Sequence, residues 1–205
     1  MSEFVFYFKQ GLYHVLDWSA YDHILFLIVL TVSYTFDSWR RILILVTLFT
    51  FGHTFSLFLA AFNVISVNSA VIEFLIPITI LIAALFNIFT AKSTPKDSRA
   101  MVSYGVTIFF GLIHGLGFSR YFKMIGNDAN SKVLALLEFA LGIEISQIII
   151  VLLVLFVSFI AHTFLRFTRR DWILIVSSIV IGMTIPMLSK IKYQQDSTLD
   201  EVSEE

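Results

Sequence analysis

The chain has 205 residues, of which 58% are hydrophobic and 14% charged, and its mean hydropathy is +0.86. Soluble domains carry about 45–50% apolar and about 25% charged residues, so the composition argues against a soluble globule and predicts an all-α polytopic transmembrane helix bundle in a lipid bilayer. The net charge of −1, without clustered basic residues, argues against nucleic acid as a partner, and the absence of cysteine excludes thiolate metal ligands and disulfides.

Apolar stretches long enough to cross a bilayer as helices recur along the chain. We expect about six spans, over residues 20–36, 40–62, 70–90, 101–118, 133–165 and 172–188. Residues 4–16 are also apolar but are interrupted by Lys9, Gln10 and His14, which favours an interfacial N-terminal helix. The spans form a single transmembrane domain over residues 1–192. The acidic stretch 193–205 has almost no apolar residues and is expected to be a disordered tail.

The basic residues of the short loops predict the orientation, because cytoplasmic loops carry an excess of Lys and Arg. Three loops on one side hold Arg40, Arg41, Lys92, Lys96, Arg99, Arg166, Arg169 and Arg170, and the opposite side holds Lys9, Arg120, Lys123, Lys132, Lys190 and Lys192. The larger group favours both termini outside. We expect a multi-pass protein of the bacterial inner membrane with this orientation.

The histidines of the predicted spans fall at a common depth. At about 1.5 Å per helical residue, His53 lies about 18 Å beyond Arg41, and His114 lies about 22 Å beyond Arg99. Both therefore belong to the leaflet that is distal to the basic loops, whereas His162 lies at the opposite end of its span. At this distal level we expect a group of histidine and acidic side chains formed by His14, Asp22, His23, His53, Glu73, His114 and Glu144.

Ionisable groups inside a membrane span cost several kcal/mol, so they normally face the bundle interior and find a partner. Imidazole and carboxylate together are typical ligands of divalent transition metals such as nickel or zinc. Asp22 precedes His23 directly and is a candidate to orient that imidazole from behind. Taken singly, His53 and His114 are equally well explained by hydrogen bonds between helices, so the metal-binding interpretation depends on the whole group.

Five segments of the chain resemble the HupE/UreJ group of hydrogenase and urease accessory membrane proteins, particularly its second branch. They are GLYHVLDWSAYDHILF at 11–26, VTLFTFGHTFSL at 46–57, VIEFLIPITILIAALFN at 71–87, FGLIHGLGF at 110–118 and LGIEISQ at 141–147. The resemblance implies a bacterial permease-like protein of six or seven helices, associated with nickel or a related divalent metal. It places His14, Asp22, His23, His53, Glu73, His114, Glu144 and Gln147 at motif positions.

Three functional hypotheses follow from these residues. The first is a permease or delivery protein that carries a divalent transition metal, nickel or a similar ion, through the His and carboxylate site. The alternative is a membrane-embedded hydrolase that uses bound zinc to cleave a lipid or a membrane protein. The third is a scaffold in which the polar groups only hold helices together. Whether the protein is an enzyme stays open at this stage, with permease favoured, and so does assembly into a homo-oligomer.

Overall fold

The structure is a computed structural model that describes residues 2–18, 21–92, 97–127 and 129–203, and this part of the chain is helical without strands. The elements are α1 (Glu3–Leu16), α2 (Asp22–Thr31), the 3-10 turn η1 (Phe36–Ser38), α3 (Trp39–Ala61), α4 (Ser69–Thr90), α5 (Asp97–Ile125), α6 (Lys132–Thr163) and α7 (Arg169–Ser203). Among the described residues, four helices are long and apolar enough to cross a membrane: Phe36–Ala61, Ser69–Thr90, Lys132–Thr163 and Arg169–Ser189. These findings confirm the all-α class and the membrane-like character.

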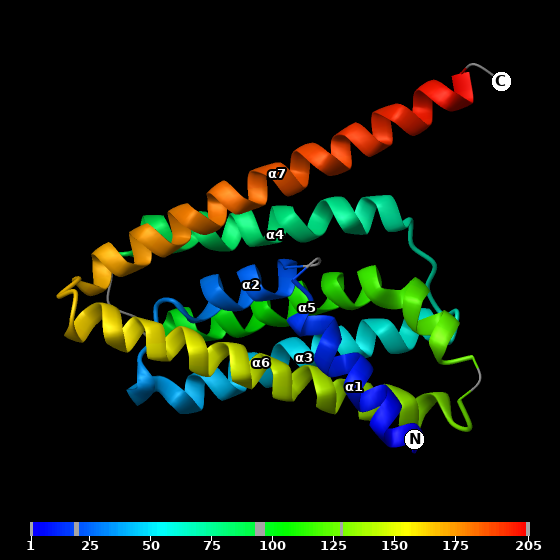
Figure 1. The fold of residues 1–205 in the computed structure, drawn as a ribbon, viewed down its shortest axis with the longest axis horizontal. Coiled ribbons are helices and arrows are strands. Elements are labelled where there is room, and N and C mark those ends of the chain that lie inside the picture. Colours follow the sequence, from blue (N-terminus) through cyan, green and yellow to red (C-terminus); the bar gives the residue numbers. More distant parts are fainter. Residues whose placement is uncertain (1, 19–20, 93–96, 128, 204–205) are drawn as a thin grey trace.

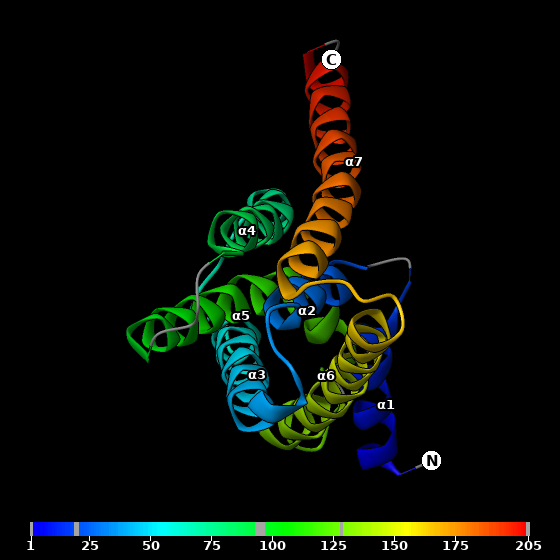
Figure 2. The same ribbon diagram turned by 90° about the vertical axis from the view of Figure 1, so that its left-hand side faces the viewer.

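The helices pack mainly in three pairs, α3 with α5, α1 with α6, and α4 with α7 (Figures 1 and 2). The short α2 contacts α1, α4, α6 and α7 and thereby joins these pairs. Its apolar side chains divide between two clusters of buried residues. Leu27 belongs to the cluster built on α1, α3 and α6, and Phe26 belongs to the cluster with α4 and α5.

The pair α1 and α6 makes a direct backbone contact at two glycines. A Cβ atom added to Gly11 would overlap the carbonyl oxygen of Phe139, and one added to Gly142 would overlap that of Phe8. Only residues without a side chain permit this approach, which is how small residues act at helix interfaces in membranes. The helix that we expected to be interfacial therefore packs tightly into the bundle along α6.

The pair α3 and α5 is joined in the same way beside two of the histidines. A Cβ added to Gly111 would overlap the carbonyl oxygen of Phe49, and one added to Gly115 would overlap that of His53. A Cβ on Gly52 would lie 2.5 Å from the carbonyl oxygen of Ile108. The small-residue spacing at Gly111 and Gly115 thus marks close helix packing, and it fixes α3 against the turn that carries His114.

One predicted span differs in the structure. The run 20–36 was expected to cross the bilayer, but α2 contains ten residues and rises only about 15 Å. Its end is marked by Thr31, whose hydroxyl donates to the carbonyl of Leu27 and whose own carbonyl accepts from the amide of Tyr34.

The acidic stretch at the C-terminus also differs from expectation. Helix α7 continues to Ser203 and extends beyond the rest of the bundle (Figure 1). The stretch 193–203, which its composition predicts to be disordered, is therefore helical, and residues 204–205 lie outside the described part. Good helix formers such as Gln194, Gln195 and Glu201 favour continuation of the helix through this stretch. The division into one domain and a tail stays a prediction.

Candidate metal centre

Three histidines from three different helices meet inside the bundle. His14 is in the last turn of α1, His23 in the first turn of α2 and His53 in the middle of α3. One nitrogen from each ring can be chosen such that all three lie within 4.8 Å of one another. The ring centroids are 4.5 Å apart for His14 and His23, 5.7 Å for His14 and His53, and 5.9 Å for His23 and His53.

His114 from α5 completes this group, which we call the histidine cluster: His14, His23, His53 and His114. Its ring centroid lies 5.1 Å from that of His23. The cluster is closed to solvent, because His53 is 0% exposed, His114 1% and His23 3%, and only His14 is partly accessible. The structure thus brings together these four histidines, which the sequence predicts at one level, and His162 lies apart from them beside Trp172.

Each ring of the histidine cluster carries at least one buried nitrogen without a hydrogen-bond partner. The Nε2 atoms of His14, His23 and His114 are in this state, as are both ring nitrogens of His53. A buried polar atom without a partner costs about 1–3 kcal/mol, so several in one place need a physical explanation. A metal ion supplies one, since neutral imidazole nitrogens are its common ligands.

Hydrogen bonds at the other nitrogen fix the tautomers of two rings. The Nδ1 atom of His23 lies 3.2 Å from Oδ1 of Asp22, and Nδ1 of His114 lies 2.8 Å from the carbonyl oxygen of Phe110. Both oxygens are acceptors, so each Nδ1 carries the proton and each Nε2 presents its lone pair to the cluster. A carboxylate or carbonyl behind a ligating histidine orients the ring and raises its basicity. Asp22 thus takes the orienting position that the sequence indicated for it.

Aromatic rings enclose the histidine cluster on two sides. Phe118 and Phe139 stack with centroids 5.0 Å apart, and Phe118 lies 3.8 Å from the ring of His14. On the other side Phe26 and Phe49 stack at 4.8 Å, and both rings contact His114 at 5.4 and 5.3 Å. These apolar rings exclude water from most of the cluster, which would strengthen electrostatic interactions between its members and a bound cation.

The glutamates predicted for the site occupy other places. The Thr47 hydroxyl donates to Oε1 of Glu144 at 2.6 Å, which makes a polar contact between α3 and α6. Glu73 is exposed on α4. Among the described residues, the ligand atoms of His14, His23 and His53 meet, and neither glutamate belongs to that group. Participation of Glu73 and Glu144 in metal binding stays a prediction.

The contacts of several buried polar residues were not predicted from the sequence. The Thr50 hydroxyl donates to Oε1 of Gln147 at 3.2 Å, and the Nε2 atom of Gln147 is buried without a partner. Glu138 is 7% exposed, and its Oε2 atom also lacks a partner. The threonines at 47 and 50 recur at helical spacing on one face of α3, and that spacing was a signal for their pairing with α6.

The fold and the site define a helical membrane protein with a buried four-histidine centre between its helices. The chain belongs to the HupE/UreJ family, because the family model described as HupE / UreJ protein matches residues 1–189. The family inferred from the five segments is thereby confirmed. Neither the curated proteins nor the solved structures contain a match to the chain.

Proposed function

We propose that this protein binds a divalent transition-metal ion, nickel or a chemically similar ion, at the histidine cluster and conducts it across the bacterial inner membrane. The observation that carries the proposal is the set of buried, unpartnered imidazole nitrogens contributed by four helices. The donor set fits such an ion, because uncharged nitrogen ligands favour nickel or zinc over magnesium or calcium. Here the metal is cargo, and the four histidines are its ligands.

The enclosure of the histidine cluster supports a transport role. The stacked pair Phe118 and Phe139 lies against His14, and the stacked pair Phe26 and Phe49 lies against His114. An ion at this centre would therefore be surrounded largely by apolar rings, as a carrier requires between loading and release. We propose that the chain crosses the membrane about six times with both termini outside. Assembly of the chain into a homo-oligomer stays a prediction.

The first experiment measures metal binding by the purified chain. Isothermal titration with nickel is expected to show one site, and His53→Ala is expected to abolish binding because it removes a central ligand. His162→Ala is the control, since this part-buried histidine is bonded through Nδ1 to a backbone carbonyl, as His114 is, but lies outside the cluster. Equal nickel affinity in the two variants would show that the cluster does not bind the ion.

The second experiment measures movement of the ion. Proteoliposomes with the wild-type chain are expected to accumulate radiolabelled nickel, whereas His53→Ala and His114→Ala vesicles are expected to match empty liposomes. The His162→Ala vesicles are expected to retain uptake. Nickel binding without uptake above empty liposomes would refute the transport role and leave the binding role intact.

A zinc-dependent hydrolase is the second candidate, and the three meeting histidines favour it. Three histidines are a common ligand set for catalytic zinc, in which a fourth position holds the reacting water. A carboxylate near that water is also needed, and the nearest one described, Asp22, is bonded to His23. The hydrolase predicts one zinc ion that stays bound through purification and dialysis, whereas a carrier releases its ion to the dialysis buffer.

A further inference from the structure

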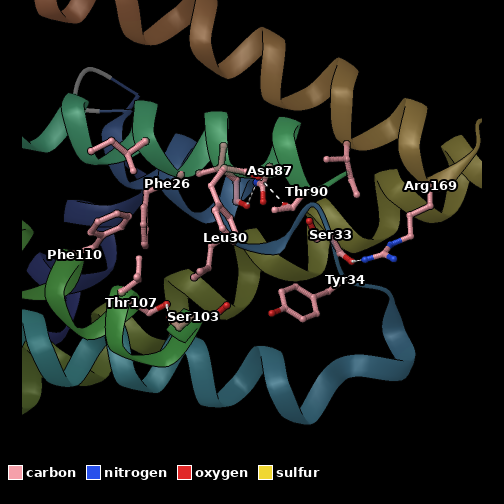
Figure 3. Close-up of a pocket in the computed structure, with 16 residues that line it drawn as sticks. Phe26, Leu30, Ser33, Tyr34, Asn87, Thr90, Ser103, Thr107, Phe110 and Arg169 are labelled. Atoms are coloured by element: carbon pink, nitrogen blue, oxygen red, sulfur yellow. Dashed lines mark hydrogen bonds between the residues drawn. The ribbon is translucent and has the colours of Figure 1, made fainter. Parts of the chain in front are cut away.

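A cavity of about 280 Å³ lies between α2, α4, α5 and α7, and none of the four histidines of the cluster lines it (Figure 3). Its deep end is formed by Phe26 and Phe110, and the ring of Phe26 also contacts His114. The cavity volume is near the lower end of the range for small-molecule sites, about 300–1,000 Å³. This space is enough for part of an elongated ligand.

The cavity is lined mainly by apolar side chains, and Arg169 is the one charged residue among those that line it. Phe26 and Phe110, with Thr107 beside them, form one end, whereas Ser33, Tyr34 and Arg169 lie at the other end (Figure 3). A ligand that fits both ends has an apolar chain and a polar head.

The polar end of the cavity carries positive charge and hydrogen-bond donors. Nη2 of Arg169 donates to the carbonyl oxygen of Ser33 at 3.1 Å, which holds the half-buried guanidinium at this end of the cavity. The Tyr34 hydroxyl lines the same end of the cavity and is a second hydrogen-bond donor there. An arginine with a neighbouring hydroxyl suits a phosphate, to which a guanidinium donates two parallel bonds.

The cavity opens on a surface that faces lipid. Ile82, Phe86 and Val106 line it, and the same side chains are 54%, 52% and 42% exposed. Ile82 and Phe86 belong to α4, one of the helices that are apolar enough to span a membrane. A ligand can therefore enter from the bilayer between α4 and α5 without passing through water.

We propose that this cavity binds an anionic phospholipid of the surrounding bilayer, with its phosphate at Arg169 and one acyl chain extending towards Phe26 and Phe110. The basic loops lie at the same end of the bundle as Arg169, and basic pockets between helices on the cytoplasmic side are typical sites for anionic headgroups. The site is separate from the histidine cluster, so the proposal does not depend on metal transport.

The test titrates the delipidated, metal-free chain in detergent with dioleoyl phosphatidylglycerol or dioleoyl phosphatidylcholine and counts bound lipids by native mass spectrometry. The wild type is expected to bind one phosphatidylglycerol at least five-fold more tightly than phosphatidylcholine. Arg169→Gln is expected to lower the affinity for phosphatidylglycerol about five-fold, because one basic residue near a headgroup contributes about 1 kcal/mol. Arg170→Gln, the exposed neighbour, serves as the matched control and is expected to leave the affinity unchanged.

A second pair of variants tests the acyl chain. Ala83→Trp fills the cavity and is expected to prevent phospholipid binding, whereas Leu85→Trp adds the same ring to α4 outside the cavity and is expected to have no effect. Equal phosphatidylglycerol affinities of Arg169→Gln and Arg170→Gln would overturn the proposal. This comparison remains a valid test even if Ala83→Trp fails to fold. Binding of oleate without binding of phosphatidylglycerol would also overturn it.

Discussion

The close approach of α3 and α5 predicts opposite effects for one substitution at two positions of the same helix. In Gly115→Ala, the new Cβ would overlap the carbonyl oxygen of His53 and crowd the Ser56 hydroxyl. In Gly105→Ala, the new Cβ would meet nothing within 4 Å. Both changes gain the helix propensity of alanine, about 1 kcal/mol, but only the first forces two backbones apart.

The magnitude follows from the nature of the obstructing atoms. Overpacking a well-filled interior costs about 1–3 kcal/mol, and the upper end applies here because a carbonyl of α3 cannot rotate away as a side chain does. After subtraction of the propensity gain, Gly115→Ala is expected to lower the free energy of unfolding by about 2 kcal/mol. Gly105→Ala is expected to raise it by up to about 1 kcal/mol.

The assay is unfolding of the purified chain in mixed detergent micelles, followed by circular dichroism. Nickel titration of the same samples tests the histidine cluster as well. The displaced α3 moves His53 away from His114, so Gly115→Ala is expected to lower the nickel affinity. A Gly115→Ala protein as stable as Gly105→Ala, with unchanged nickel affinity, would refute the direct backbone contact between α3 and α5.

Three further outcomes are expected. Asp22→Asn should weaken nickel binding about 10–100-fold, because an amide orients the His23 ring less well than a carboxylate does. Unchanged nickel affinity in the titration would show that Asp22 does not orient this ring. Nickel at 100 times its dissociation constant should raise the free energy of unfolding by about 2.7 kcal/mol, with EDTA reversing the gain and His53→Ala showing none. Asn87→Ala should cost about 1–3 kcal/mol in the same unfolding assay, because the Asn87 amide donates at 2.6 Å to the buried carbonyl of Val29; stability equal to the wild type would contradict this.

The sequence predicted at which depth of the bundle the histidines gather, but it did not predict which other residues lie beside them. Residue counts along each helix gave the depth of His53 and His114 and so placed them together. The same counts grouped Glu73 and Glu144 with them, because depth alone does not state which way a side chain points around its helix. Helices that are apolar on every side carry little information about that direction.

The length of α2 and the packing of α1 could not be predicted from the sequence for a related reason. A long apolar run such as 20–36 resembles one crossing helix, and only local hydrogen bonds at Thr31 end α2 early. The pairing of α1 with α6 depends on Gly11 and Gly142, which are distant in sequence and meet only in the folded chain. The cavity beside Phe26 likewise arises from four helices and has no signature in any one of them.

The glycine contacts assign the four histidines to two helix pairs. His53 and His114 sit on α3 and α5, whose backbones touch, so their spacing is set by that pair. His14 sits on α1, which is fixed to α6, and His23 sits on the short α2. The hydrogen bonds from Thr47 to Glu144 and from Thr50 to Gln147 connect the two pairs. A shift of one pair against the other would therefore break these two bonds and change the spacing of the four imidazole rings. The geometry of the histidine cluster thus depends on two threonine hydroxyls that are not part of it.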